Sequence, residues 1–330
     1  MPNTIVGPAL PNIPWQERPE GSSDLVWRCT DNPIIGWNPL PSAARIFNSA
    51  VIPFRDGFAG VFRADHKTGR PQLHVGFSED ALQWEIDDAV IDWRDEQGAA
   101  APTSYAYDPR VVCLDGRYYV VWCDDFPGPS IGLGVTDDFE RFTRLERPLM
   151  PFNRNGVLFP RKIGGRYVLL SRPSDSGHTP FGDIVLSHSP DLTFWGKHRL
   201  VMRSGGPGWW QGIKIGAGPI PIETRAGWLL FYHGVSGPCN GFVYSIGAAL
   251  LDLDRPERVI YRSRDYLLTP EREYETVGFV PNVAFPCATL QDAESGRIAI
   301  YYGAADTYTA IAFTQVDELL EHLARNSDVF

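Results

Sequence analysis

The sequence predicts an all-β fold, a five-bladed β-propeller, and two periodic observations favour it. The first is a set of five paired apolar runs, rich in β-branched and aromatic residues, each joined by a tight turn that contains glycine. These turns are Asp56-Gly57, Asp115-Gly116, Gly164-Gly165, Ala226-Gly227 and Ser295-Gly296. Such dipeptides are typical of β-hairpins, because their residues tolerate a positive φ. Successive turns are about 50 to 70 residues apart, a spacing expected of propeller blades.

The second observation is an acidic turn that follows the third strand expected in each repeat. The aspartates of these turns are Asp80, Asp138, Asp191, Asp252 and Asp317. A β-sandwich made of many hairpins is the alternative fold. Five copies of both signals in the same phase favour the propeller.

The chain divides into three predicted segments without a flexible linker between them. Residues 1–35 are rich in proline and are expected to form an extended arm, and residues 36–315 form the propeller. Residues 316–330 are expected to form a C-terminal helix, because Leu319, Leu320 and Leu323 make an apolar stripe. Arm and helix could close the ring or contact a neighbouring subunit, and the sequence leaves both possibilities open.

Charge and composition exclude several classes of function. A net charge of −10 argues against nucleic acid or an anionic membrane as a partner. The sequence shows no long apolar span and no signal-peptide pattern, and its five cysteines lack metal or disulfide spacing. No P-loop or dinucleotide motif is found. We therefore expect a cytoplasmic enzyme with reduced thiols and no bound metal.

Polar residues stand at the ends of the hairpin strands, where the active site is expected. Those before the first strands are Asn48, Asp108, Arg154, Lys214 and Asn282. Those at the ends of the second strands are Arg63, Asp124, Arg172, His233 and Asp306. In a radial arrangement of blades, all of these side chains would converge on one central pocket.

Asp108 is the candidate general acid. It lies in the stretch Tyr105-Ala-Tyr-Asp-Pro-Arg110, where Pro109 favours an extended backbone. Aromatic neighbours tend to raise the pKa of a carboxyl group, as a general acid requires. The alternative is an aspartate that caps a turn, with Arg110 as its partner on the surface.

Four basic residues at strand ends predict a site for a dianion such as phosphate, and they are Arg154, Arg172, Lys214 and His233. The alternative is that each is paired with a local carboxylate such as Asp183 or Glu223. A glycosidase normally needs two carboxylates, and the candidates for the second are Asp124, Asp125 and Asp306. Bound phosphate could instead attack the anomeric carbon itself. The basic cluster therefore distinguishes phosphorolysis from hydrolysis.

Several motifs resemble the β-mannoside phosphorylases of glycoside hydrolase family 130. They are the stretches 156–183, 107–110, 214–219, 232–235 and 302–306, and the resemblance extends from about Asn48 to Asp306. It implies a five-bladed propeller and an inverting phosphorylase without a cofactor. Such an enzyme cleaves a non-reducing-end β-mannoside with inorganic phosphate and yields α-mannose 1-phosphate.

The resemblance also implies roles for individual residues. Asp108 would be the single general acid, acting through a mannose hydroxyl. Phosphate would be held by Arg154, Arg172, Lys214, His233 and Tyr244, and mannose by Asn48, Ser49, Arg63, Tyr107 and Asp306. The motifs favour the branch that acts on β-1,4-mannooligosaccharides or mannosyl-N-acetylglucosamine, and a homo-oligomer is expected. A β-mannoside hydrolase and a sugar-binding propeller without catalysis are the alternatives.

Overall fold

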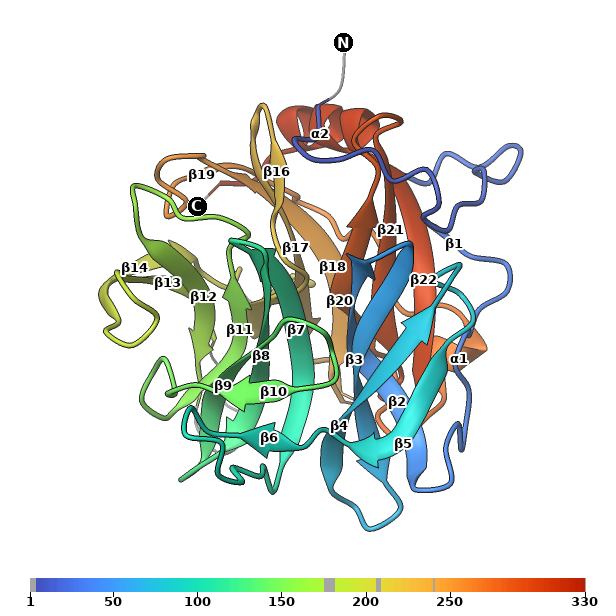
Figure 1. Ribbon diagram of the computed structural model, residues 1–330. Coiled ribbons are helices and arrows are strands. Elements are labelled where there is room, and N and C mark those ends of the chain that lie inside the picture. The colour runs from blue at the N-terminus through green and yellow to red at the C-terminus, as the bar shows by residue number, and fades with distance from the viewer. Residues whose placement is uncertain (1–3, 175–181, 206–208, 240, 330) are drawn as a thin grey trace.

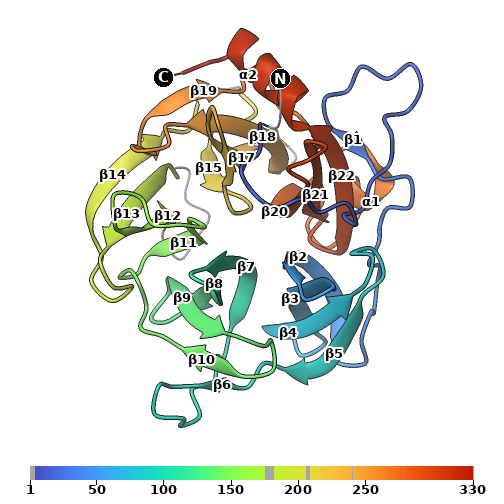
Figure 2. The same ribbon diagram turned by 45° about the horizontal axis from the view of Figure 1, so that its top comes forward.

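The computed structural model describes residues 4–174, 182–205, 209–239 and 241–329 and confirms the five-bladed β-propeller (Figures 1 and 2). Each blade is a sheet whose first strand lies next to the central axis, as Figure 2 shows. Blade 1 contains β2 (Ala43–Phe54), β3 (Gly57–His66), β4 (Pro71–Ser78) and β5 (Glu85–Val90). Blade 2 contains β7 (Ala106–Leu114), β8 (Arg117–Asp125), β9 (Pro129–Thr136), β10 (Phe142–Arg144) and, parallel to β10, β6 (Trp93–Arg94).

The remaining blades follow the same order from the axis outward. Blade 3 contains β11 (Asn153–Leu158), β12 (Tyr167–Pro173), β13 (Ile184–Ser189) and β14 (Gly196–Met202). Blade 4 contains β15 (Lys214–Ala217), β16 (Ile222–Thr224), β17 (Gly227–Ser236), β18 (Val243–Leu251) and β19 (Val259–Arg262). Blade 5 contains β20 (Ala284–Gln291), β21 (Arg297–Ala304), β22 (Tyr308–Gln315) and β1 (Trp27–Arg28). The helices are α1 (Glu273–Thr276) and α2 (Val316–Arg325).

The N-terminal arm closes the ring, which answers one question that the sequence leaves open. Its strand β1 pairs antiparallel with β22, with Trp27 opposite Phe313, and becomes the outermost strand of blade 5. Next to Trp27, the Arg28 guanidinium donates to the fully buried carboxylate of Glu275, at 2.7 Å. The domain boundaries at residues 35 and 316 stay predictions.

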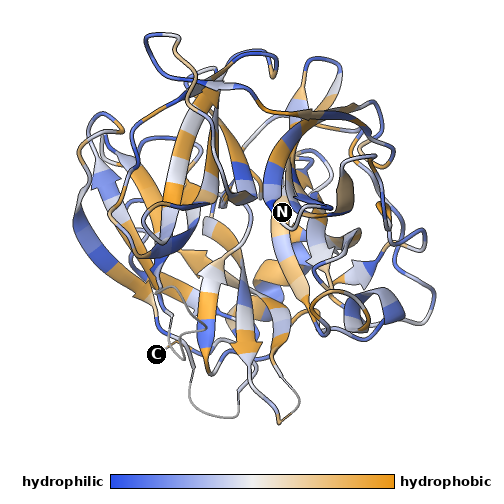
Figure 3. Ribbon diagram, turned by 90° about the horizontal axis from the view of Figure 1, so that it is seen from below, coloured by the Kyte–Doolittle hydropathy of each residue, from blue (hydrophilic) through white to orange (hydrophobic). Residues whose placement is uncertain are grey.

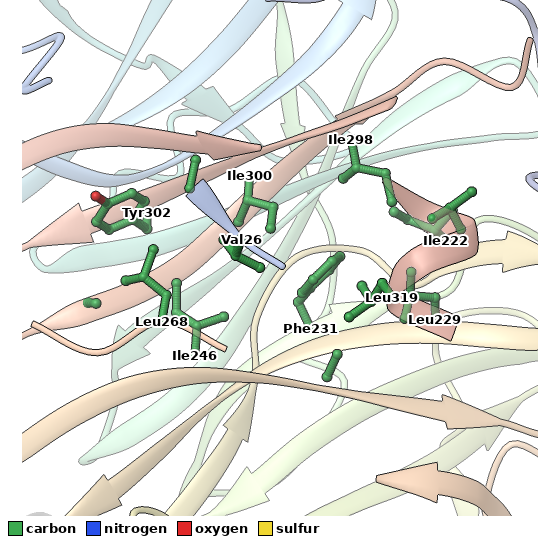
Figure 4. Close-up of a cluster of buried hydrophobic side chains, with 14 of the residues drawn as sticks. Val26, Ile222, Leu229, Phe231, Ile246, Leu268, Ile298, Ile300, Tyr302 and Leu319 are labelled. Atoms are coloured by element: carbon green, nitrogen blue, oxygen red, sulfur yellow. The ribbon is translucent and has the colours of Figure 1, made fainter. Parts of the chain in front are cut away.

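Hydrophobic clusters fill the spaces between neighbouring blades. The described residues form five clusters, one for each of the five blade interfaces. Figure 4 shows the cluster between blades 4 and 5, where Leu319 of α2 lies beside Leu229 of β17. The view from below in Figure 3 shows the apolar residues concentrated in the strands. Among the described residues, no helix is long and apolar enough to cross a membrane.

Two of the five predicted hairpin turns lie one residue earlier than expected. The loops are Arg55-Asp56 and Arg225-Ala226, and the glycines that follow begin β3 and β17. Arg55 takes the positive φ of 54° in its loop. Gly57 is needed for space instead, because a Cβ there would lie 2.6 Å from the Ser78 carbonyl oxygen. The Asp115-Gly116 turn has positive φ at both residues, as predicted.

The acidic turns are confirmed in blades 1 to 4. In each turn the aspartate accepts hydrogen bonds from the backbone N–H groups two and three residues ahead, at 2.8–3.0 Å, and these aspartates are Asp80, Asp138, Asp191 and Asp252. In blade 5, Asp317 lies in the first turn of α2 instead. Bonds from the Arg141 and Glu140 N–H groups hold the pKa of Asp138 well below its usual range.

We predict that Asp138→Ala lowers the free energy of unfolding by about 1 kcal/mol, the size typical of a lost capping oxygen. Asp138→Asn should lower the free energy of unfolding less, because its amide oxygen can still accept both hydrogen bonds. Urea unfolding at pH 7 measures the difference.

The pH dependence of the same variants separates charge from hydrogen bonding. Because the folded-state pKa of Asp138 is lowered, its charge stabilises the protein above the unfolded-state value of 3.8. That stabilisation disappears as the pH falls through the folded-state pKa. The advantage of the wild type over Asp138→Asn should therefore shrink in acid, and a constant difference would contradict the assignment.

Candidate active site

β-Bulges in three inner strands aim polar side chains at the axis. The register shifts between Phe47 and Ala50 in β2, between Tyr107 and Arg110 in β7, and between Arg154 and Val157 in β11. Within each bulge one residue that is not glycine has a φ near 50°, and these residues are Asn48, Asp108 and Asn155. A bulge turns a side chain out of the regular alternation, and such strained positions gather at functional sites.

The bulges correct one expectation from the sequence. Asn48, Asp108 and Arg154 do not precede their strands but lie within them. The strands begin earlier, because backbone pairing resumes on the far side of each bulge: Ala106 still pairs with Asp124.

Asp108 is held by two donors from blade 1. Its Oδ1 accepts hydrogen bonds from Asn48 Nδ2 at 2.9 Å and from Arg63 Nη1 at 2.7 Å, and the residue is only 9% exposed. Among the described residues, no group donates to its Oδ2. The carboxyl group is therefore fixed through one oxygen, which leaves the other for a ligand.

Arg63 is itself held by a second carboxylate that sequence reasoning missed. Arg63 Nε donates to Asp65 Oδ1 at 3.0 Å, and Arg45 Nη2 donates to Asp65 Oδ2 at 3.2 Å. Burial raises the pKa of Asp306 to about 7; Arg63 opposes this shift and Asp108 adds to it. Asp65, Asp108 and Asp306 thus surround Arg63. We call these three carboxylates, with Arg45 and Arg63, the acid half of the site.

Arg110 is buried, which contradicts the alternative of a turn-capping Asp108 with a surface partner. It is 1% exposed, so it is not a surface partner of Asp108. Its guanidinium donates to the backbone carbonyls of Pro109, Gly218 and Pro286, which belong to blades 2, 4 and 5. Arg110 therefore ties three blades together near the axis.

Blades 3 and 4 supply the predicted basic residues, which we call the cationic half: Arg154 (β11), Arg172 (β12), Lys214 (β15) and His233 (β17). Arg154 lies opposite Arg172 in the strand register, and Arg172 donates to His233 Nε2 at 3.2 Å. Within the described ranges, the two arginines and Lys214 make no ion pair.

Among the described residues, the carboxylates named as alternative partners do not pair with the cationic half. Asp183 accepts from the Ser204 N–H at 2.8 Å, and Glu223 pairs with Arg161 at 2.7 Å. Neither carboxylate is thus paired with the cationic half.

Burial and mutual repulsion change the ionisation of this half. Burial, together with Arg172 and Arg154, lowers the pKa of Lys214 to about 8. Burial and the neighbouring Arg172 hold the pKa of His233 well below its usual range, so the imidazole is neutral at pH 7. Its neutral Nε2 can therefore accept the hydrogen bond from Arg172. Three positive charges remain without a counterion in the part of the chain that the structure describes, and such buried charges are unfavourable until an anion binds.

Two tyrosines lie between the halves. Burial raises the pKa of Tyr107, on which Arg154 and Asp108 both act electrostatically. Burial also raises the pKa of Tyr244 to about 12, with Arg172, Asp306 and Asp108 acting on it. Lys214 Nζ lies 5.5 Å from the centre of the Tyr244 ring. The tyrosines thus connect the carboxylates to the cations.

Buried polar atoms without partners gather at the same place. Among the described residues, those of the site are Asn48 Oδ1, Arg154 Nε, Asn155 Oδ1, Arg172 Nε and His233 Nδ1. Most buried polar groups in proteins are hydrogen-bonded, so such a group of exceptions indicates a ligand site. Asn155 is absent from the sequence-based prediction. The feature that could have indicated Asn155 is its position in β11, which corresponds to the positions of Asn48 and Asp108 in their strands.

Two glycines make room for these side chains. A Cβ on Gly303 would lie 1.8 Å from Asn48 Oδ1. A Cβ on Gly216 would lie 2.4 Å from His233 Cε1 and 2.9 Å from Asn155 Oδ1. Any larger residue would displace the site, so both glycines belong to its construction.

Asp124 and Asp125 do not join the site, whereas Ser49 and Asn282 lie next to residues of it. Asp124 points to Arg144 and Arg147, which donate to its Oδ2 at 2.9 and 2.7 Å, and Asp125 is exposed. Ser49 is buried beside Asn48, and its hydroxyl donates to the Phe47 carbonyl. Asn282 accepts from the Tyr244 N–H through its own carbonyl. Because Arg144 and Arg147 bind the Asp124 carboxylate, it is not available as a second catalytic group.

Comparison with known proteins agrees with this geometry. The family described as β-1,4-mannooligosaccharide phosphorylase matches residues 9–325. The chain is 53% identical to a β-1,4-mannooligosaccharide phosphorylase from Ruminococcus albus over 98% of each chain. It is 30% identical to a 1,2-β-oligomannan phosphorylase from a Thermoanaerobacter species, covering 88% of this chain and 98% of that one.

A solved structure shares the architecture. It is the β-1,2-mannobiose phosphorylase of Listeria innocua in complex with β-1,2-mannobiose, with a TM-score of 0.79 and 25% identity over 91% of this chain and 99% of that one. The family match spans nearly the whole chain, as does the similarity to the Ruminococcus protein. The chain therefore belongs to the β-1,4-mannooligosaccharide phosphorylases of glycoside hydrolase family 130.

Proposed function

We propose that this protein is an inverting phosphorylase that removes the non-reducing-end mannose from β-1,4-mannooligosaccharides. Inorganic phosphate is the co-substrate, and the products are α-mannose 1-phosphate and an oligosaccharide shortened by one unit. The observation that carries the proposal is the cationic half, which holds three positive charges without a counterion among the described residues. A phosphate dianion supplies the missing charge beside Asp108.

Each half of the site has its own part in the reaction. Arg154, Arg172 and Lys214 hold phosphate, while Asn48 and Asp306 bind hydroxyls of the mannose. A phosphate oxygen attacks the anomeric carbon and the glycosidic C–O bond breaks on the opposite face. Asp108 gives its proton to the leaving oxygen through a mannose hydroxyl. Arg63 and Asn48 then stabilise the Asp108 carboxylate that remains.

Hydrolysis is less compatible with the arrangement of carboxylates. An inverting hydrolase needs a second carboxylate on the opposite face of the sugar, with room for a water molecule. Asp124 is bound by Arg144 and Arg147. Asp306 interacts electrostatically with Arg63, as Asp108 does, and so belongs to the acid half. A sugar-binding protein without catalysis would not need the cationic half.

The linkage follows from the relatives. The Ruminococcus relative, at 53% identity, is named for β-1,4-mannooligosaccharides, whereas the relative at 30% is named for β-1,2-linked mannan. We therefore favour the β-1,4 linkage. No further cofactor is expected, and a homo-oligomeric, cytoplasmic protein remains a prediction.

The first experiment is incubation of the purified protein with β-1,4-mannobiose, with and without inorganic phosphate. Mannose 1-phosphate that forms only with phosphate present is the expected result. Release of free mannose from both sugar units without phosphate would show a hydrolase and contradict the proposal.

Asp108→Asn should lower kcat by about a thousandfold or more, because the amide cannot donate the catalytic proton. Phosphorolysis of β-1,4-mannobiose measures the loss. Asp125→Asn changes an exposed carboxylate on the adjoining strand and is the matched control. Activity of Asp108→Asn within about tenfold of the wild type, a barrier change of only about 1.4 kcal/mol, would exclude Asp108 as the acid.

Arg154→Ala and Lys214→Ala should each raise the KM for phosphate more than the KM for the sugar, because both side chains are assigned to the anion. Initial rates over a grid of both substrates separate the two constants. Lys162→Ala serves as the control, since Lys162 pairs with Asp115 at a hairpin turn. Equal rises in both constants would count against the assignment.

Anion binding should also weaken as the pH rises. Lys214 has a pKa lowered to about 8, so it loses its charge above that pH. Sulfate keeps its double charge there, and titration calorimetry from pH 6.5 to 10 should show affinity falling by about tenfold. The midpoint lies at or above 8, because the bound dianion stabilises the ammonium group. Lys214→Arg, which stays charged, should abolish this fall, and an unchanged profile in that variant would contradict the role of Lys214.

A further inference from the structure

Phe279 is a largely exposed aromatic residue at the active-site end of the propeller. It is 60% exposed and lies in the loop that leads into β20. Its N–H donates to Thr307 Oγ1 at 2.8 Å, and the next residue, Val280, donates to the Ala305 carbonyl at 3.2 Å. The loop is therefore fastened to the turn that carries Asp306.

The ring is also fixed from blade 1. The Arg45 guanidinium lies 3.8 Å from the centre of the Phe279 ring. Arg45 donates to Asp65, Asp65 accepts from Arg63, and Arg63 donates to Asp108. A continuous series of contacts thus runs from the candidate acid to an exposed aromatic ring, with three side chains between them.

A single exposed aromatic ring is normal on a protein surface, so the surroundings of Phe279, and not its exposure, indicate a ligand. The face of a pyranose carries C–H groups that pack on the electron-rich face of an aromatic ring. Arg45 Nε is buried and lacks a partner among the described residues, so the guanidinium is not fully satisfied. An aromatic face beside a guanidinium can bind both the C–H face and the hydroxyls of one sugar.

We propose that Phe279, backed by Arg45, binds the acceptor part of a β-mannooligosaccharide beyond the sugar that is joined to the cleaved mannose. This inference rests on the proposed function. In this series of contacts Arg63, Asp65 and Arg45 separate Phe279 from Asp108, and we therefore assign the ring to the acceptor and not to the transferred mannose. Phe279 therefore distinguishes longer acceptors from short ones and takes no part in the chemical step.

The test compares β-1,4-mannotriose with β-1,4-mannobiose as substrates for phosphorolysis. In Phe279→Ala the ratio of kcat/KM for the trisaccharide to that for the disaccharide should fall by about tenfold, the size of a single aromatic contact. Phe279→Trp should keep most of the wild-type ratio, because the aromatic face remains. Phe194→Ala is the control: Phe194 is 72% exposed, in the turn after β13 at the other end of the propeller.

A binding measurement separates this inference from the proposed function. Calorimetry on Asp108→Asn with each sugar needs no turnover, and adding Phe279→Ala should weaken mannotriose binding more than mannobiose binding. If the wild type shows no phosphorolysis but the variants show this difference in binding, the proposed function is overturned and the sugar site is supported. An equal effect on both sugars would overturn the inference. A second result would also overturn the inference: Phe279→Ala changes the oligomeric state but leaves the ratio of kcat/KM for the trisaccharide to that for the disaccharide unaltered. The ring would then contact a second copy of the chain.

Discussion

Packing between neighbouring blades is the constraint on which the rest of the molecule depends. The three bulge residues with positive φ are strained, at about 1–3 kcal/mol each. They persist because the residues just beyond them are locked in the core. Ala50, Val111 and Val157 follow the bulges in β2, β7 and β11, and all three are buried in inter-blade clusters. The hydrophobic clusters therefore hold the side chains of the candidate site in conformations that the local chain would not adopt.

The site divides its charges unequally. In the acid half, arginines and carboxylates neutralise one another, whereas the cationic half keeps its repulsion. The protein as a whole carries a net charge of −10 and would repel phosphate at long range. Salt screens charges beyond about 8–10 Å, so an approaching phosphate experiences mainly the local cluster. The proposed affinity for the anion thus depends on the charges of the cationic half, which are opposite in sign to the net charge of the protein.

The sequence predicted the features that depend on local chemistry. Glycine turns and aspartate turns are encoded within a few residues, and they appeared in the structure except that two hairpin turns lie one residue earlier and Asp317 lies in α2. The bulges were not predictable, because register is set between strands and not within one. The buried role of Arg110 was not predictable for the same reason: its carbonyl partners on Gly218 and Pro286 lie far along the chain. Asp65 was missed although it lies two residues from Arg63 in β3, on the same face of the strand, where the pair could have been recognised. Asn155 was missed because its place in the site depends on the bulge in β11.

The closure of the ring by β1 has a consequence for how the chain folds. Blade 5 combines β1 from the N-terminal arm with β20, β21 and β22 from the end of the chain. It is therefore complete only after all other blades have formed. Pairing of Trp27 with Phe313 is among the most distant contacts in the chain, and contacts of such high order slow folding. Until then β22 is an unpaired edge, open to strands of other molecules. The arm thus acts as a built-in partner that protects the last edge of the sheet from association with other chains.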